Sequence, residues 1–157
     1  MNRVSTHAMG GGTLPPQATL ADLLDRRTMP YGIALLRLVI GGLFISHLYG
    51  KFAFFGIDNW WTGLERAGYP AWVLVYTLSA EFAGAVLITL GVYTRWASLY
   101  ALPMMIGATL FWVQRKGFYF TGAGWELPFI WSLMLLVQAL LGDGAFALAS
   151  PLRLRLR

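Results

Sequence analysis

The chain has 157 residues, of which 57% are hydrophobic and 12% are charged, about half the charged fraction of a typical soluble domain. This composition excludes an ordinary water-soluble domain and leaves room for about three to five membrane-spanning helices. The formal net charge of +5 is concentrated towards the two tails, which indicates contact with the anionic head groups of a lipid bilayer rather than with nucleic acid. There is no cysteine, which excludes thiol chemistry, disulfides and thiolate metal sites within this chain.

The two ends of the chain differ in composition from its middle. Residues 1–29 are polar and rich in glycine and proline, which predicts a disordered or interfacial N-terminal tail. Within this tail, residues 18–27 could form a short helix whose leucines lie on the membrane surface. Residues 147–157 form a basic C-terminal tail, and residues 30–146 between the tails are expected to form a membrane domain.

Four apolar segments predict an all-α protein, a bundle of four transmembrane helices in antiparallel up-down order. These segments cover about residues 33–49, 71–91, 96–113 and 127–141. The segment between the first two is crowded with aromatic residues, which favours a loop in the membrane interface. Pro103 should kink the third helix, and a neighbouring helix must then satisfy the freed carbonyl group.

Basic residues near the ends of the four segments predict the orientation. Six lie on the side that holds both termini: Arg26, Arg27, Arg95, Arg153, Arg155 and Arg157. Four lie on the other side: Lys51, Arg66, Arg115 and Lys116. We therefore expect a multi-pass protein of the bacterial cytoplasmic (inner) membrane with both termini in the cytoplasm.

Glu81 stands in the middle of the second apolar segment, where an unpaired carboxylate would cost several kcal/mol. Arg37 lies inside the first segment, and its reach makes a buried pair with Glu81 the expected arrangement. Such a pair either fixes the register of the helices and nothing more, or forms a proton or ligand site. Both interpretations stay open from the sequence.

Further polar residues are expected near the outer surface, above the Arg37–Glu81 pair. His47 and Lys51 are neighbours on one helix face, and Glu126 enters the fourth segment at the same level. Taken alone, Lys51 is more typical of a lysine whose ammonium group reaches the membrane–water interface. Taken alone, His47 is more typical of a histidine that caps a buried carbonyl group. With Glu126 they are more typical of a site for ligand binding or proton exchange, although no catalytic residue can be assigned.

Three residues are expected to be structural: Gly84, Arg95 and Pro103. Gly84 lies on a face of small residues that lets another helix approach closely. With two histidines and no cysteine, the chain is expected to hold no haem, no iron–sulfur cluster and no other metal site. No covalently bound cofactor is expected either.

Three stretches resemble the DoxX family of small four-helix membrane proteins: RLVIGGLFISHLYGKF, AEFAGAVLITLGVYTRWAS and GFYFTGAGWELPFI. The resemblance covers about residues 31–146. The polar positions that match are Arg37, His47, Lys51, Glu81, Gly84, Arg95 and Glu126. The family takes its name from a subunit associated with an archaeal thiosulfate:quinone oxidoreductase, so the resemblance implies a quinone-linked redox role with partner proteins.

Two classes of function therefore stay open. The first is a redox-linked membrane subunit or accessory that binds quinone or a small anion among the five polar candidates, with electrons supplied by a substrate, a quinone or a partner. The second is a non-catalytic membrane module that assembles or anchors protein partners, or associates with itself as a homo-oligomer. A small transporter is a third interpretation, disfavoured because the two halves show no internal repeat.

Overall fold

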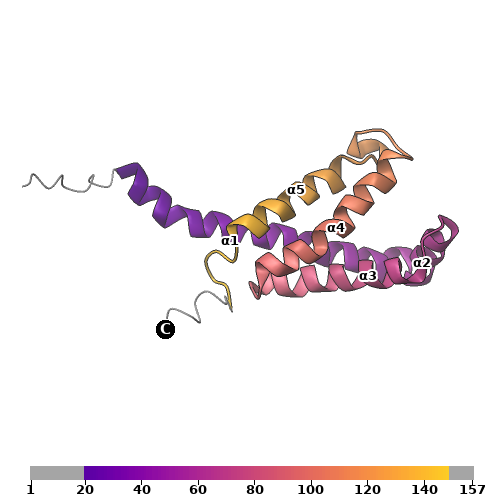
Figure 1. The fold of residues 1–157 in the computed structure, drawn as a ribbon, viewed down its shortest axis with the longest axis horizontal. Coiled ribbons are helices and arrows are strands. Elements are labelled where there is room, and N and C mark those ends of the chain that lie inside the picture. Colours follow the sequence, from indigo (N-terminus) through magenta and orange to yellow (C-terminus); the bar gives the residue numbers. More distant parts are fainter. Residues whose placement is uncertain (1–19, 149–157) are drawn as a thin grey trace, which may run out of the picture.

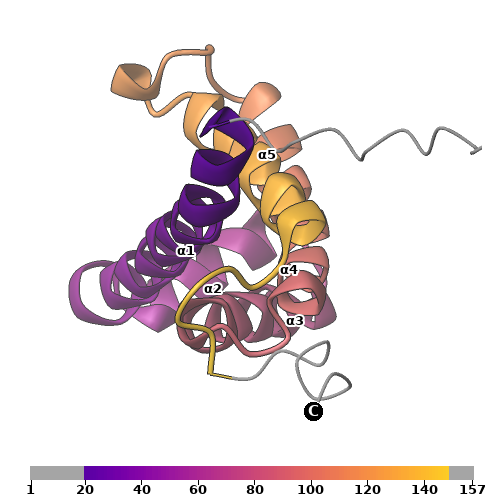
Figure 2. The same ribbon diagram turned by 90° about the vertical axis from the view of Figure 1, so that its left-hand side faces the viewer.

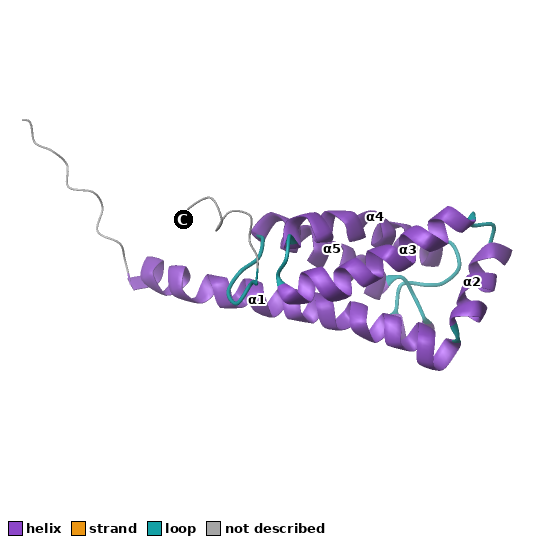
Figure 3. Cartoon of the chain, turned by 90° about the horizontal axis from the view of Figure 1, so that it is seen from below, coloured by secondary structure: helices purple, strands orange, loops and turns teal. Residues whose placement is uncertain are grey.

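The structure, a computed structural model, describes residues 20–148. Four long helices make up the bundle: α1 (Leu20–Tyr49), α3 (Ala71–Ala83), α4 (Thr94–Val113) and α5 (Glu126–Leu141). A further helix, α2 (Ile57–Arg66), runs across one end of this bundle (Figure 3). The described residues contain no strand, so the predicted all-α class is confirmed.

Three helical stretches are long and apolar enough to cross a membrane: Leu23–Phe55, Ala71–Ile88 and Thr94–Val113. The fourth, Glu126–Leu141, is apolar but shorter, with 16 residues or about 24 Å at the usual helical rise. The chain is therefore a multi-pass membrane protein, while the four-span up-down topology stays a prediction. Viewed along the bundle in Figure 2, α1, α3, α4 and α5 follow one another around a common axis.

Helix α1 is longer than the sequence indicates. The short helix expected over residues 18–27 is present from Leu20, but it continues without a break through Pro30 into the first span. Its first turns extend beyond the rest of the bundle (Figure 1). The predicted tail boundary at residue 30 falls inside this helix, and residues 1–19 and 149–157 of the predicted tails lie outside the described residues. The division into tails and membrane domain stays a prediction.

Two π-helical segments follow on from α1 and α3. Gly50–Phe55 extends α1, and Gly84–Ile88 extends α3. A π-helical turn is wider than an α-helical turn, so it changes which side chains face the bundle, and such turns are frequent at functional sites. The aromatic stretch that was expected to be a loop is thus largely helical, since it consists of the first π-helical segment and α2.

Helices α1 and α3 pack closely because glycine stands at the contact. A Cβ atom at Gly84 would overlap the ring of Phe44, and one at Gly41 would overlap Thr89. The rings of Phe44 and Trp131 lie 4.7 Å apart and carry this packing across to α5. Glycine and aromatic side chains thus hold α1, the π-helical segment after α3, and α5 in close contact.

The end of the bundle opposite α2 is closed by the chain that follows α5. The amide of Ala145 donates to the carbonyl oxygen of Pro30 at 2.8 Å, and that of Leu148 donates to Leu90 at 3.1 Å. Arg95 donates to the carbonyl oxygens of Ala139 and Leu141, both at 3.3 Å. At the α2 end, in contrast, α4 and α5 diverge from α1 and α3 (Figure 1).

Candidate functional site

A cavity of about 840 Å³ lies at the α2 end of the bundle, where the helices diverge. All five helices contribute to its wall. Most of the lining side chains are aromatic or aliphatic, including Phe55, Trp60, Tyr69, Trp72, Tyr76, Met104, Phe111, Trp112 and Trp131. The ionisable side chains Lys51, Glu81 and His47 stand among them, so the cavity combines an apolar wall with a small polar centre.

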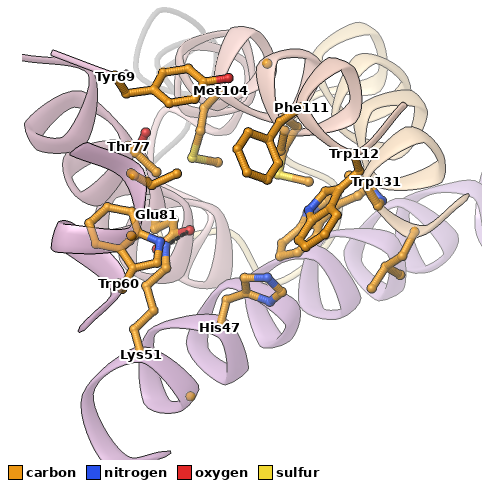
Figure 4. A pocket seen from close by; sticks show the side chains of 18 of the residues that line it. His47, Lys51, Trp60, Tyr69, Thr77, Glu81, Met104, Phe111, Trp112 and Trp131 are labelled. Atoms are coloured by element: carbon orange, nitrogen blue, oxygen red, sulfur yellow. Dashed lines mark hydrogen bonds and ion pairs between the residues drawn. The ribbon is translucent and has the colours of Figure 1, made fainter. Parts of the chain in front are cut away.

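The polar centre is an ion pair between Lys51 and Glu81. The ammonium nitrogen of Lys51 lies 2.5 Å from both carboxylate oxygens, and the side chains are only 9% and 6% exposed. The ring of Trp60 lies 4.2 Å from the same ammonium nitrogen and gives a cation–π contact. Figure 4 shows Lys51 extending from the π-helical segment after α1 to Glu81 beside Trp60. Each charge is thus neutralised by a partner inside the helix bundle.

His47 lies four residues before Lys51 and reaches the cavity from the same helix. Its ring meets Trp131 at 5.0 Å between centroids with an interplanar angle of 78°, an edge-to-face contact. In Figure 4 His47 lies between the Lys51–Glu81 pair and Trp131. An acid–base group and a buried ion pair therefore share one cavity.

The predicted pairing of Arg37 with Glu81 is wrong. Arg37 is 2% exposed and donates to the backbone carbonyl oxygen of Asp143 at 2.7 Å, at the closed end of the bundle. The π-helical segment continues the first span to Phe55, which leaves Lys51 four residues inside its end. From this segment Lys51 reaches Glu81, whereas Arg37 holds the segment that follows α5.

Glu126 also stands apart from the cavity. Its carboxylate accepts a hydrogen bond from the backbone amide of Phe120 at 2.9 Å and so fixes the turn that precedes α5. Its neighbours Leu127 and Pro128 line the cavity, but Glu126 does not. Of the five candidates from the sequence, the structure brings His47, Lys51 and Glu81 together and places Arg37 and Glu126 elsewhere.

Pro103 lies inside α4, which continues through it, and lines the cavity. The hydroxyl group of Tyr76 on α3 donates to the carbonyl oxygen of Tyr100 at 2.6 Å, one turn before the proline. The hydroxyl groups of Ser79 and Tyr100 are 2.8 Å apart and add a second link. Helix α3 thus supplies polar partners next to the proline, and Pro103 itself lines the cavity.

Sequence reasoning missed the aromatic members of the site, above all Trp60, Tyr76 and Trp131. The only signal for Trp60 was the aromatic richness between the first two spans, which was interpreted as an interfacial loop. Trp131 stands inside the apolar fourth segment, where the sequence does not distinguish it from other core residues. Among residues 20–148, no three histidine, aspartate or glutamate side chains lie close enough to share a metal ion.

Comparison with known proteins adds a family and one relative. The model of the DoxX family matches residues 32–115, a range that contains His47, Lys51 and Glu81. A protein of Haemophilus influenzae described as uncharacterized is 36% identical over 122 residues, which cover 76% of this chain and 89% of that protein. No solved structure matches the chain significantly.

Proposed function

Since this chain belongs to the DoxX family of membrane proteins, we propose that its cavity binds the head group of a lipid-soluble quinone and exchanges protons with it. The observation that carries this proposal is the buried Lys51–Glu81 pair, which stands in the wall of an aromatic cavity of about 840 Å³. A cavity of this volume is in the usual range for small-molecule sites.

The chemistry of a quinone matches the groups in the cavity. Its two carbonyl oxygens need hydrogen-bond donors, and Lys51 and His47 are donors on the same helix. Reduction to the quinol takes up two electrons and two protons, and each carbonyl oxygen becomes a hydroxyl group. Glu81 and His47 are groups that exchange protons, while the electrons come from a substrate or a partner protein.

The charge balance of the site favours an uncharged ligand over a small anion. The carboxylate of Glu81 already occupies the ammonium group of Lys51 through both of its oxygens, each at 2.5 Å. An anion would have to displace this carboxylate and leave it buried without a partner, which is costly. A neutral ring can instead pack against Trp60 and Phe111 without disturbing the pair.

We also propose that α5 is the fourth span and that both termini lie in the cytoplasm of a bacterial cell. Helix α5 runs back along α4 (Figure 1), which would return the chain to the side on which it started. Its 16 residues are short for a bilayer, and local thinning of the bilayer accommodates such a helix at modest cost. In this orientation the cavity and α2 face the external side.

The alternative function, a non-catalytic module that assembles partner proteins, predicts no ligand in the cavity. It is supported by the closed packing of the Lys51–Glu81 pair, because such a pair can serve to hold α1 and α3 in register. The two functions differ in one measurable property, which is saturable binding of quinone.

The test is titration of a ubiquinone or menaquinone analogue into protein in lipid nanodiscs. We expect His47→Ala and Lys51→Ala to give folded proteins whose affinity falls at least about tenfold, or about 1.4 kcal/mol. Lys116→Ala is the matched control, because Lys116 is exposed and lies outside the cavity. Absence of saturable binding to the wild type, alone or with its co-purifying partners, would refute the proposal and favour the assembly module.

A further inference from the structure

Aromatic side chains from α3 and from the turn that precedes it contact α4 at two levels. Nearer the middle of the bundle, the Tyr76 hydroxyl donates to the Tyr100 carbonyl oxygen at 2.6 Å. Nearer the α2 end of the bundle, the centroids of the Tyr69 and Phe111 rings lie 5.9 Å apart. Between these two levels, Gly107 of α4 lines the cavity.

Glycine occupies the α4 face between these two levels. Tyr100, Met104, Gly107 and Phe111 follow one another at intervals of four, three and four residues, which places them on one face of the helix. Gly107 lines the cavity, and among the described residues no atom lies within 4 Å of the position that a Cβ atom there would take. Met104 and Phe111 therefore flank a gap in the row of side chains.

The gap opens onto the part of the surface that faces lipid. Trp72 on α3 lines the cavity and is 70% exposed, and Gly107 is also exposed. Val73 and Ala108, the neighbours of Trp72 and Gly107 in sequence, also line the cavity and are apolar. The cavity also reaches the surface beside α1, but there its rim contains the polar side chains of Ser46 and His47.

We propose that the gap at Gly107 is a lateral port through which the apolar chain of the bound ligand extends into the bilayer. The ligand class is an amphiphile with a flat, uncharged head group and one long apolar chain. This inference rests on the proposed function and adds to it the path of the chain and the residue that determines chain-length specificity. An apolar chain prefers the apolar rim, because burying the polar groups of Ser46 or His47 against it would leave them unpaired.

The experiment compares two quinones with the same head group, one with a single isoprene unit and one with eight, in nanodiscs. Gly107→Phe fills the gap, so we expect it to lower affinity for the long-chain quinone at least tenfold and for the short-chain quinone less than twofold. Gly32→Phe is the matched control, since Gly32 is an exposed helical glycine with equally open space and lies outside the cavity. Ser46→Phe narrows the competing opening beside α1 and should leave the ratio of the two affinities unchanged.

Each other result overturns the proposal. If Gly107→Phe leaves long-chain affinity unchanged, or if Ser46→Phe selectively lowers it instead, the chain leaves the cavity elsewhere and the proposed function survives without this port. If Gly107→Phe lowers both affinities equally, Gly107 acts on the head-group site and not on the chain. If the wild type binds neither quinone, the proposed function fails together with the port.

Discussion

Replacement of Lys51 by methionine tests the energetic role of the ion pair most sharply. The substitution keeps an unbranched side chain of similar length but removes the ammonium group. The carboxylate of Glu81, whose side chain is only 6% exposed, then loses the partner that contacts both of its oxygens at 2.5 Å. Two charge-assisted hydrogen bonds of about 1.5–3 kcal/mol each are lost, in agreement with about 3–5 kcal/mol for breaking a buried pair. The contact with Trp60 adds about 1 kcal/mol.

A double-mutant cycle separates the pair from its parts. We expect Lys51→Met and Glu81→Leu each to lower the free energy of unfolding by about 3–5 kcal/mol, whereas the double variant stays within about 1–2 kcal/mol of the wild type because no charge is left buried. The assay is reversible unfolding by sodium dodecyl sulfate in mixed micelles. Lys116→Met, which alters an exposed lysine, should change stability by less than about 0.5 kcal/mol. A double variant that is as unstable as the sum of its singles would refute the reasoning.

Two further predictions concern packing and topology. Gly84→Ala should lower the free energy of unfolding by about 1–3 kcal/mol, because the added methyl group overlaps the ring of Phe44. Gly42→Ala, at an open position on α1, is the control and should not destabilise the protein. Equal effects of the two substitutions in thermal melts would contradict this packing. Because the chain has no cysteine, Asp58→Cys and Tyr93→Cys each give a protein with a single labelling site. A membrane-impermeant maleimide applied to intact cells should label the Asp58→Cys variant only. Labelling of the Tyr93→Cys variant alone would reverse the proposed orientation.

The apolar segments were sufficient to predict the helices of the bundle, since hydrophobic length is a direct property of the sequence. The sequence could not reveal that the first span continues to Phe55 as a π-helical segment, because such a turn has no signature in residue type. Lys51 therefore lies inside the first span, and it takes the place expected for Arg37 beside Glu81.

The role of Arg37 was also beyond sequence reasoning. Its partner is a backbone carbonyl oxygen in the segment after α5, and a backbone carbonyl group is present in every residue. Only the fold shows which of them returns to α1. Likewise, the aromatic stretch after the first span indicated an interface, but its folding into α2 across the cavity depends on contacts far apart in the chain.

The central claim, that the cavity binds the head group of a lipid-soluble quinone, is tested most directly by photoaffinity labelling of the wild-type protein. A quinone analogue with a photoreactive group on its ring is added to the protein in nanodiscs, irradiated, and the labelled positions are found by mass spectrometry. We predict labels on cavity-lining residues such as Trp60, Met104 and Phe111, which unmodified quinone suppresses by competition. Labels only on outward-facing side chains such as Leu35 and Trp96, insensitive to competition, would contradict the account.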